Sequence, residues 1–415
     1  MSTPEARAAV VPVEQLRVLC ISHSAVSRNA GRLRYAPLLG RTDLAIDVVA
    51  PARWHEGSRK TIADPPHPGD VPVHVLPIRL PKVGPATWHL HHYEGLGDVM
   101  RRLQPQVIHL WQEPWSLVTL QAVRLRNKLC PQTPIVLEVD QNILKRLPPP
   151  FEQIRRYVLR QTGFILARSV EALRVVEACG YTGPSALVGY GVDTTVFQPG
   201  LRQAGRAKFG FEGFTVGYVG RMVSEKGVDD LIDAAARTAA PVNLALMGDG
   251  PHLQALLQRA AAVGIADRVG VHPWGGPEDV AAFMGGLDLL ALLTRTTRTV
   301  REQFGRVIIE AQACGTPVIG STCGAIPDVV GDGGWIVPES DPAAVATVID
   351  RLMMDRDELQ AGCLNAQGKV TKRFSYGIVA DTLAKAWWSA YRPDLPAGCT
   401  TADRDAVLRP TVAAL

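Results

Sequence analysis

The stretch Glu302-Gln-Phe-Gly-Arg-Val-Ile-Ile-Glu310, followed directly by Ala-Gln-Ala-Cys-Gly-Thr-Pro-Val-Ile-Gly320, decides the fold. It predicts a loop that enters a helix, a helix end at Gly315 and a buried strand after Pro317. One carboxylate precedes the helix, and a second lies about two turns inside it. The first amides of a helix have no partner within the helix, so its start is an anion site.

The two carboxylates beside this anion site need an explanation, because phosphate alone gives no reason for them. A nucleotide sugar supplies one. Its diphosphate would lie on the helix start, its sugar hydroxyls at one Glu and its ribose hydroxyls at the other. We interpret the segment as a site of this kind.

The length of 415 residues predicts two domains of about 200 residues each. Apolar residues make up 47% and charged residues 20%, which is typical of a soluble globular protein. Residues 1–190 carry 23 basic and 15 acidic side chains, and the remainder 21 and 25. The basic first half indicates either an anionic partner, such as a membrane surface or a phosphorylated acceptor, or a solvated surface. No nucleic acid partner is expected.

The seven cysteines are scattered and form no C-x-x-C pair, which predicts a reducing compartment and no zinc or disulfide framework. The first residues show no signal pattern, and no apolar run reaches about 18 residues. We therefore expect a cytoplasmic protein, with peripheral contact to the inner face of the plasma membrane if the basic half binds lipid.

Apolar runs alternate with helix-like stretches, which predicts two series of βαβ units, each with a parallel sheet. In the first half, expected strands are residues 16–22, 44–50, 71–77, 107–111 and 135–139, and expected helices are 90–103, 116–129, 151–167 and 169–179. Turn residues at 188–200 separate this half from a second series over 214–337. The fold class is α/β, with two Rossmann-like domains whose strand ends face across a cleft. The predicted domains are 1–190 for the acceptor, 191–372 for the donor, a helix across the junction at 373–392 and a disordered tail at 393–415.

Residues with suitable chemistry follow several expected strands. Gly220 lets the backbone turn, and Arg221 and Lys226 then place two cations that suit a phosphate. Gly248 serves either a tight turn or a ligand contact, and Trp274 either packs or stacks on a base. In the first half, Arg28, Arg32 and Arg34 form either a phosphate-facing group or a solvated basic face. Further candidates there are Glu113, Asp140 and Asn142.

No metal is expected. Asp355-Arg-Asp357 and Asp403-Arg-Asp405 spell a D-x-D pattern, but the first is typical of a helical surface and the second lies in the tail. His89, His91 and His92 are not spaced to hold one ion. No P-loop or nucleophile elbow occurs either.

The sequence resembles the bacterial family-4 retaining glycosyltransferases, which have the GT-B fold. The residues that carry this resemblance are Gly220-Arg221…Lys226-Gly227, Met247-Gly-Asp-Gly-Pro251, Glu302-x7-Glu310, Pro317-Val-Ile-Gly-Ser…Gly324-Ala-Ile-Pro-Asp-Val-Val330 and the linker Gly191-Val-Asp193…Phe197-x-Pro199. The resemblance is strong over residues 185–340 and weaker over the first half. Gln141-Asn142 with the following Pro148-Pro-Pro150 is similar to one bacterial subset.

The resemblance implies a role for each matching residue. Arg221 and Lys226 would bind the donor diphosphate, Glu302 the sugar hydroxyls and Glu310 the ribose, with the amides of Phe304 and Gly305 near the phosphate. Family members use no divalent metal, since basic side chains and the helix dipole take up the departing charge. We predict catalytic roles for Arg221, Lys226, Glu302 and Asp140, and nucleotide contacts for Gly220, Gly248, Trp274, Phe304, Gly305 and Glu310.

The chain departs from the family pattern at two places. Residues 24–31 lack the Gly-Gly pair that many members carry near the donor phosphate. Asp140 stands where many members have a His close to the donor sugar. An acidic group there contacts sugar hydroxyls differently, so the sugar and the role of Asp140 are open.

The expected activity is retaining transfer of a hexose-like sugar from a nucleoside diphosphate to an acceptor hydroxyl, without a cofactor. The acceptor would be a glycan, a lipid-linked molecule or a small molecule, in cell-surface polysaccharide or glycolipid synthesis. The alternatives are a nucleotide-sugar epimerase or a phosphorylase of the same fold, and a non-catalytic nucleotide-sugar-binding subunit. A dehydrogenase is disfavoured because no G-x-G-x-x-G follows residues 16–22.

Overall fold

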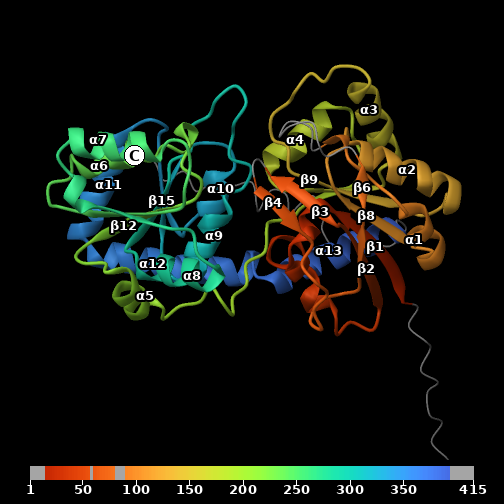
Figure 1. Cartoon of the computed structure of the whole chain (residues 1–415), viewed down its shortest axis with the longest axis horizontal. Helices are drawn as coiled ribbons and strands as arrows, with labels where there is room; N and C mark the ends of the chain where they lie inside the picture. Colours follow the sequence, from red (N-terminus) through yellow and green to blue (C-terminus); the bar gives the residue numbers. More distant parts are fainter. Residues whose placement is uncertain (1–14, 57–58, 80–88, 393–415) are drawn as a thin grey trace, which may run out of the picture. The chain divides into compact units, whose positions relative to one another are not determined.

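The structure is a computed structural model that describes residues 15–56, 59–79 and 89–392. The predicted disordered tail at 393–415, with its Asp403-Arg-Asp405 pattern, lies outside the described residues. Two sheets built on parallel strands organise the rest, together with two short antiparallel hairpins (Figure 1). The predicted α/β class with two parallel sheets is confirmed.

The first sheet has the strand order β11-β10-β9-β8-β1-β2-β5. Its strands are β1 (Leu16–Ser22), β2 (Leu44–Pro51), β5 (Val73–Leu76), β8 (Val107–Trp111), β9 (Ile135–Val139), β10 (Phe164–Ala167) and β11 (Ser185–Leu187). The accompanying helices are α1 (Leu96–Leu103), α2 (Leu117–Leu129), α3 (Phe151–Gln161) and α4 (Val170–Ala178). The hairpins are β3 (Arg53–Glu56) with β4 (Arg59–Ile62), and β6 (Ile78–Arg79) with β7 (His92–Tyr93).

Two helix predictions in this half were wrong in part. The helix expected over 151–167 ends at Gln161, and Phe164–Ala167 is a strand. A buried apolar run of four residues fits either structure, and Gly163 in front of it stops the helix. The helix expected over 90–103 begins only at Leu96, after Gly95 at a φ of 76°, because His92 and Tyr93 pair with β6.

The second sheet is wholly parallel and has the order β14-β13-β12-β15-β16-β17. Its strands are β12 (Thr215–Val219), β13 (Asn243–Met247), β14 (Val269–His272), β15 (Leu289–Leu292), β16 (Val318–Ser321) and β17 (Gly334–Val337). The helices are α5 (Arg202–Phe209), α6 (Val228–Ala235), α7 (Leu253–Ala262), α8 (Pro277–Gly286), α9 (Arg306–Ala313), α10 (Ile326–Val330), α11 (Pro342–Met354) and α12 (Arg356–Arg373). The chain order reverses between β12 and β15, and ligands of such sheets bind at the strand ends beside this reversal.

The ends of β12 and β13 approach each other through two glycines. A Cβ atom on Gly248 would lie 2.1 Å from the carbonyl oxygen of Gly220, and the φ of Gly248 is 137°. No other residue fits this position without moving the backbone. The glycines therefore hold the two strand ends together at the edge where the loops begin.

Contacts divide the chain into two compact units. Among the described residues, the first unit holds 15–138, 150–164 and 384–392, and the second holds 139–149 and 165–383. The division falls within α13 (Tyr376–Tyr391). In the first unit, Trp387 of this helix is fully buried, with its ring centroid 5.8 Å from that of His109. The domain boundaries predicted from the sequence, and a helix across their junction, stay predictions.

Across the described residues, none of the helices combines the length and the apolar character that crossing a membrane requires.

Lys369 on α12 is a buried lysine whose side chain contacts the end of another helix. Its side chain is 7% exposed, and its ammonium donates a hydrogen bond to the carbonyl oxygen of Val329 in the last turn of α10. A cation is favourable at that end of a helix. Burial is the main cause that lowers the pKa of Lys369, to about 7 from 10.5, and nearby Arg373 lowers it further.

The stability of the protein should therefore depend on pH through Lys369. Between pH 7 and 10.5 the unfolded chain binds a proton that the folded chain lacks, so the free energy of unfolding rises with pH. In this range we expect the free energy of unfolding of wild type to rise by about 1.4 kcal/mol per pH unit relative to that of Lys369→Met. Urea unfolding at several pH values measures the difference. Lys372→Met, on the exposed face of the same helix, is the control, and its difference in unfolding free energy from wild type should not change with pH. If the difference between wild type and Lys369→Met is also independent of pH, the prediction is contradicted.

Candidate functional site

The centre of the site is a contact between Lys226 and Glu302 in the second unit. Lys226 ends the short 3₁₀ turn after β12, and Glu302 lies in the loop before α9. The Lys226 ammonium is 2.6 Å from Oε2 of Glu302, and the Thr294 hydroxyl donates to the same oxygen at 2.9 Å. Thr294 follows β15, so the three residues meet where the strand order reverses. The sequence predicted Lys226 and Glu302, and the structure brings them together.

The loop that carries Glu302 is fixed by its backbone. The Glu302 carbonyl accepts hydrogen bonds from the Ala325 amide at 3.0 Å and from Nδ2 of Asn142 at 2.9 Å. Its own amide donates to Sγ of Cys323 at 3.4 Å. With the side chain only 14% exposed, the carboxylate has a defined position.

The start of α9 offers a group of amides. Gly305 caps the helix with a φ of 80°. Within the described residues, no hydrogen-bond acceptor faces the amides of Phe304, Gly305, Arg306 or Val307. The Phe304 ring is buried and lies 5.3 Å from the ring of Tyr190, so Phe304 can offer a ligand only its backbone. The amides of Phe304 and Gly305 are the expected phosphate contacts, and that role stays a prediction.

Arg221 has a side chain that is available to a ligand, whereas Gly220 and Gly248 have only backbone amides. The Arg221 side chain is exposed and has no ion pair with the described residues, while its carbonyl accepts a bond from the Tyr218 hydroxyl at 2.8 Å. The amide of Gly220 donates to the Met247 carbonyl, and that of Gly248 donates to the His272 carbonyl. Both glycine amides are therefore occupied. Their geometry favours the tight-turn interpretation, and a ligand contact at either stays a prediction.

Glu310 lies inside α9, with its side chain 15% exposed and Oε1 at 3.6 Å from Nη2 of Arg306. Burial raises the pKa of Glu310, and the charge of Arg306 opposes this shift. Trp274 is 55% exposed and follows β14, the edge strand, whereas Arg221 and Lys226 follow β12. No recorded contact links Trp274 to the Lys226–Glu302 pair, and its stacking on a base stays a prediction.

Asp140 is held by an arginine that the sequence analysis missed. Its Oδ1 accepts a hydrogen bond from Nε of Arg168 at 2.7 Å. Arg168 is fully buried, donates to the carbonyls of Val188 and Gly189, and stacks 3.9 Å from the centre of the Tyr190 ring. Asp140 is therefore a carboxylate whose counter-charge, Arg168, is fixed in place. The signal in the sequence was an arginine directly after the apolar run 164–167.

The first-unit arginines are engaged within the protein. Arg28 pairs with Asp70 at 2.8 Å, and Arg34 pairs with Glu138 at 2.7 Å. Arg32 is buried and donates to the Ala25 carbonyl at 2.7 Å. A solvated basic face is therefore wrong for Arg32 and Arg34. Glu113, the other candidate of this unit, is 8% exposed.

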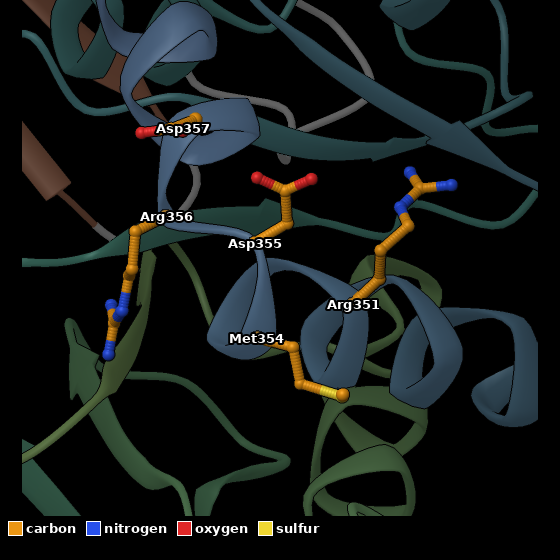
Figure 2. Close-up of a pocket in the computed structure, with 5 residues that line it drawn as sticks. All are labelled: Arg351, Met354, Asp355, Arg356 and Asp357. Atoms are coloured by element: carbon orange, nitrogen blue, oxygen red, sulfur yellow. The ribbon is translucent and has the colours of Figure 1, made fainter.

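The D-x-D pattern at Asp355 and Asp357 lies beside a pocket of about 640 Å³ between α11 and α12 (Figure 2). Figure 2 shows the two carboxylates apart, and Asp355 caps α12 by accepting a bond from the Glu358 amide at 2.9 Å. Over the described ranges, no cluster of three or more His, Cys, Asp or Glu residues could hold a metal ion. The absence of a metal requirement stays a prediction.

Comparison with known families and proteins gives a consistent result. Residues 203–367 match the family model described as glycosyl transferases group 1. A D-inositol 3-phosphate glycosyltransferase of Segniliparus rotundus is 33% identical over 217 residues, which are 49% of this chain and 46% of that protein. One of Mycolicibacterium smegmatis is 34% identical over 207 residues, 48% of this chain and 45% of that protein. The chain thus spans about half the length of these curated relatives.

Solved structures match a larger share of the chain than the curated relatives do. Anabaena HepE, solved in complex with UDP and glucose, has a TM-score of 0.69 and 18% identity, covering 90% of this chain and 100% of that one. Sucrose-phosphate synthase of Thermosynechococcus elongatus has a TM-score of 0.69 and 20% identity, covering 91% and 100%. The chain therefore has the GT-B fold, and its residues 203–367 are similar in sequence to the group 1 glycosyl transferases.

Proposed function

We propose that the protein is a retaining glycosyltransferase that moves a hexose-like sugar from a nucleoside diphosphate to an acceptor hydroxyl without a divalent metal. The observation that carries this proposal is the Lys226–Glu302 contact at 2.6 Å beside the amides at the start of α9. A cation for a phosphate and a carboxylate for sugar hydroxyls lie at one point of the fold.

The leaving diphosphate gains charge as the sugar departs, and the site offers positive groups for it. Lys226 and the exposed Arg221 supply two cations, and the α9 amides add dipoles at a helix start. Groups that are already in place stabilise developing charge without reorganisation. This arrangement is our reason for proposing that no metal is needed.

Glu302 suits the sugar because only half of its carboxylate is occupied. Oε2 accepts bonds from Lys226 and Thr294, while Oε1 accepts none from the described residues. A sugar hydroxyl can donate to Oε1 without displacing Lys226. The ion pair thereby fixes the oxygen that meets the sugar.

Retention requires the acceptor hydroxyl to attack on the face that the diphosphate leaves. The bond from the anomeric carbon to the phosphate oxygen breaks, and the bond to the acceptor oxygen forms. The departing phosphate oxygen takes the acceptor proton. In this scheme the enzyme needs no carboxylate nucleophile, and its own residues bind and orient the reactants.

The names of similar proteins suggest which substrates to test. The relatives are named as D-inositol 3-phosphate glycosyltransferases, so hydroxyl acceptors that carry a phosphate come first. HepE was solved with UDP-glucose, so donors with a uracil base are tested first. A glycan or lipid-linked acceptor, cell-surface synthesis and contact of the basic half with anionic membranes belong to the same proposal.

Two other activities predict different products. An epimerase would convert the donor alone into an isomer. A non-catalytic subunit would bind the donor and give no transfer to any acceptor. Analysis of products with and without acceptors separates all three.

Replacing Lys226 by Ala should lower the turnover rate by about 100-fold, because one charged donor to the leaving group is lost. Steady-state kinetics with the tightest-binding donor measures the effect. Lys372→Ala, which removes an exposed lysine on α12, should retain the wild-type rate. Unchanged turnover in a folded Lys226→Ala variant would argue against the assignment of the leaving-group site.

Replacing Glu310 by Ala should weaken binding of the nucleoside diphosphate about tenfold or more, because a ribose diol would donate charge-assisted hydrogen bonds to this carboxylate. Calorimetric titration of UDP, GDP and ADP into wild type and variant tests this. Glu177→Ala, at an exposed position of α4, is the control. Failure of wild type to bind any of the three would count against the whole proposal.

Excess EDTA should leave the transfer rate unchanged, since the proposed charge stabilisation comes from Arg221, Lys226 and backbone amides. Rates are compared before and after dialysis against the chelator. A rate that collapses and is restored by Mg²⁺ or Mn²⁺ would refute metal independence.

A further inference from the structure

The side chain of Asn142 occupies an unusual position in the second unit. It lies between β9 and α3 and is 3% exposed. Its Nδ2 donates to the carbonyl oxygen of Glu302 at 2.9 Å and to Oε2 of Glu171 at 3.1 Å. Glu171, near the start of α4, in turn accepts a bond from Arg301 at 3.2 Å through its other oxygen. Asn142 is thus joined to the loop of Glu302 twice, once directly and once through Glu171.

These contacts determine which way the amide faces. Both neighbours of Nδ2, a carbonyl and a carboxylate oxygen, can only accept hydrogen bonds. Rotating the amide by half a turn would place Oδ1 against two acceptors and lose both bonds. The chemistry of the neighbours therefore assigns the nitrogen to this side and Oδ1 to the opposite one.

The Oδ1 atom is left without a donor. It is buried, and none of the described residues donates a hydrogen bond to it. Buried acceptors in folded proteins almost always have a partner, since an unpaired one has lost its hydrogen bonds to water and gained none in return. Since none of the described residues supplies this donor, a ligand or an ordered water can supply it.

We propose that Oδ1 of Asn142 accepts a hydrogen bond from a hydroxyl of the transferred sugar, which makes Asn142 a determinant of sugar specificity. This inference rests on the proposed function. The peptide that Asn142 holds is that of Glu302, whose carboxylate is proposed to bind sugar hydroxyls. One residue thereby orients the carboxylate loop and adds a second acceptor for the sugar.

The chemistry of Oδ1 selects the sugar over other parts of the donor. An ionised diphosphate presents only acceptor oxygens, which Oδ1 would repel. The ribose hydroxyls are assigned to Glu310 on α9. A sugar hydroxyl is a donor, and its epimer would point elsewhere, so a buried acceptor discriminates between configurations. Sites built to pair a substrate hydroxyl reject analogues that lack it, because the buried partner is then unpaired.

The first experiment compares donors with and without their sugar. Wild type and Asn142→Ala are titrated calorimetrically with UDP and UDP-glucose, GDP and GDP-mannose, and ADP and ADP-glucose, and the tightest pair is followed. We expect Asn142→Ala to bind the diphosphate within about twofold of wild type and the sugar nucleotide about tenfold more weakly. Asn127→Ala, which removes a bond from an asparagine on α2 to the Tyr157 hydroxyl, is the matched control.

The second experiment identifies the hydroxyl. Monodeoxy versions of that donor, each lacking one hydroxyl of the hexose, are titrated into both proteins. Wild type should bind one of them much more weakly than the parent, and Asn142→Ala should bind that one and the parent equally. The other deoxy donors should lose the same affinity in both proteins. This coupling between one hydroxyl and one side chain would not arise from a loop that is merely loosened.

Other outcomes overturn the inference. Equal losses for the diphosphate and the sugar nucleotide would mean that Asn142 only supports the loop. Full retention of deoxy discrimination in Asn142→Ala would mean that a water pairs with Oδ1. If the variant does not fold, as thermal unfolding would show, wild type that binds every deoxy donor like the parent still refutes the contact. Wild type that binds no diphosphate at all would refute the proposed function, whereas the preceding results refute only the role of Asn142.

Discussion

The hydrogen-bonded ion pair between Lys226 and Glu302 is the interaction on which the site depends. The two residues are 76 positions apart in the sequence, and they meet because β12 and β15 are neighbours at the point where the strand order reverses. A half-buried carboxylate needs a counter-charge, and a half-buried ammonium needs an acceptor. Each residue therefore holds the other in place. The backbone bonds of Glu302 to Ala325 and Asn142 fix the loop before α9, and the ion pair fixes the Glu302 carboxylate beside the start of that helix.

The sequence predicted elements best where buried strands are bounded by polar residues. The limits of β1, β8 and β9 agree with prediction to the residue, since each is a short apolar run at the end of a polar stretch. Prediction failed at β10, because four apolar residues after a helix have no period that separates a strand from a further helical turn. A change from the 3.6-residue spacing of a helix to the two-residue spacing of a strand can be recognised only over more residues than the four of β10.

Local spacing also explains which residues the sequence could suggest as candidates for the site. Arg221, Lys226, Glu302 and Glu310 stand in short motifs around turns and helix starts, so residue type and position were enough to single them out. Arg168 and Glu171 were missed because their partners lie 28 and 29 residues away, at Asp140 and Asn142, and no periodicity links such positions. Gly220 and Gly248 were recognised as turn residues, but only the structure shows that their amides are already bonded. Long-range polar pairing is a property of the assembled fold.

The contact between Gly220 and Gly248 restricts how this protein can change over evolution. A side chain at position 248 would collide with the carbonyl of Gly220, so variation there is removed by selection for folding before any effect on ligands is felt. These two strand ends therefore present backbone and no side chain at positions 220 and 248. We therefore expect changes in ligand preference to arise from side chains in the loops that follow β9 and β15. A directed-evolution library would be better spent on positions 142 and 294 than on the glycines.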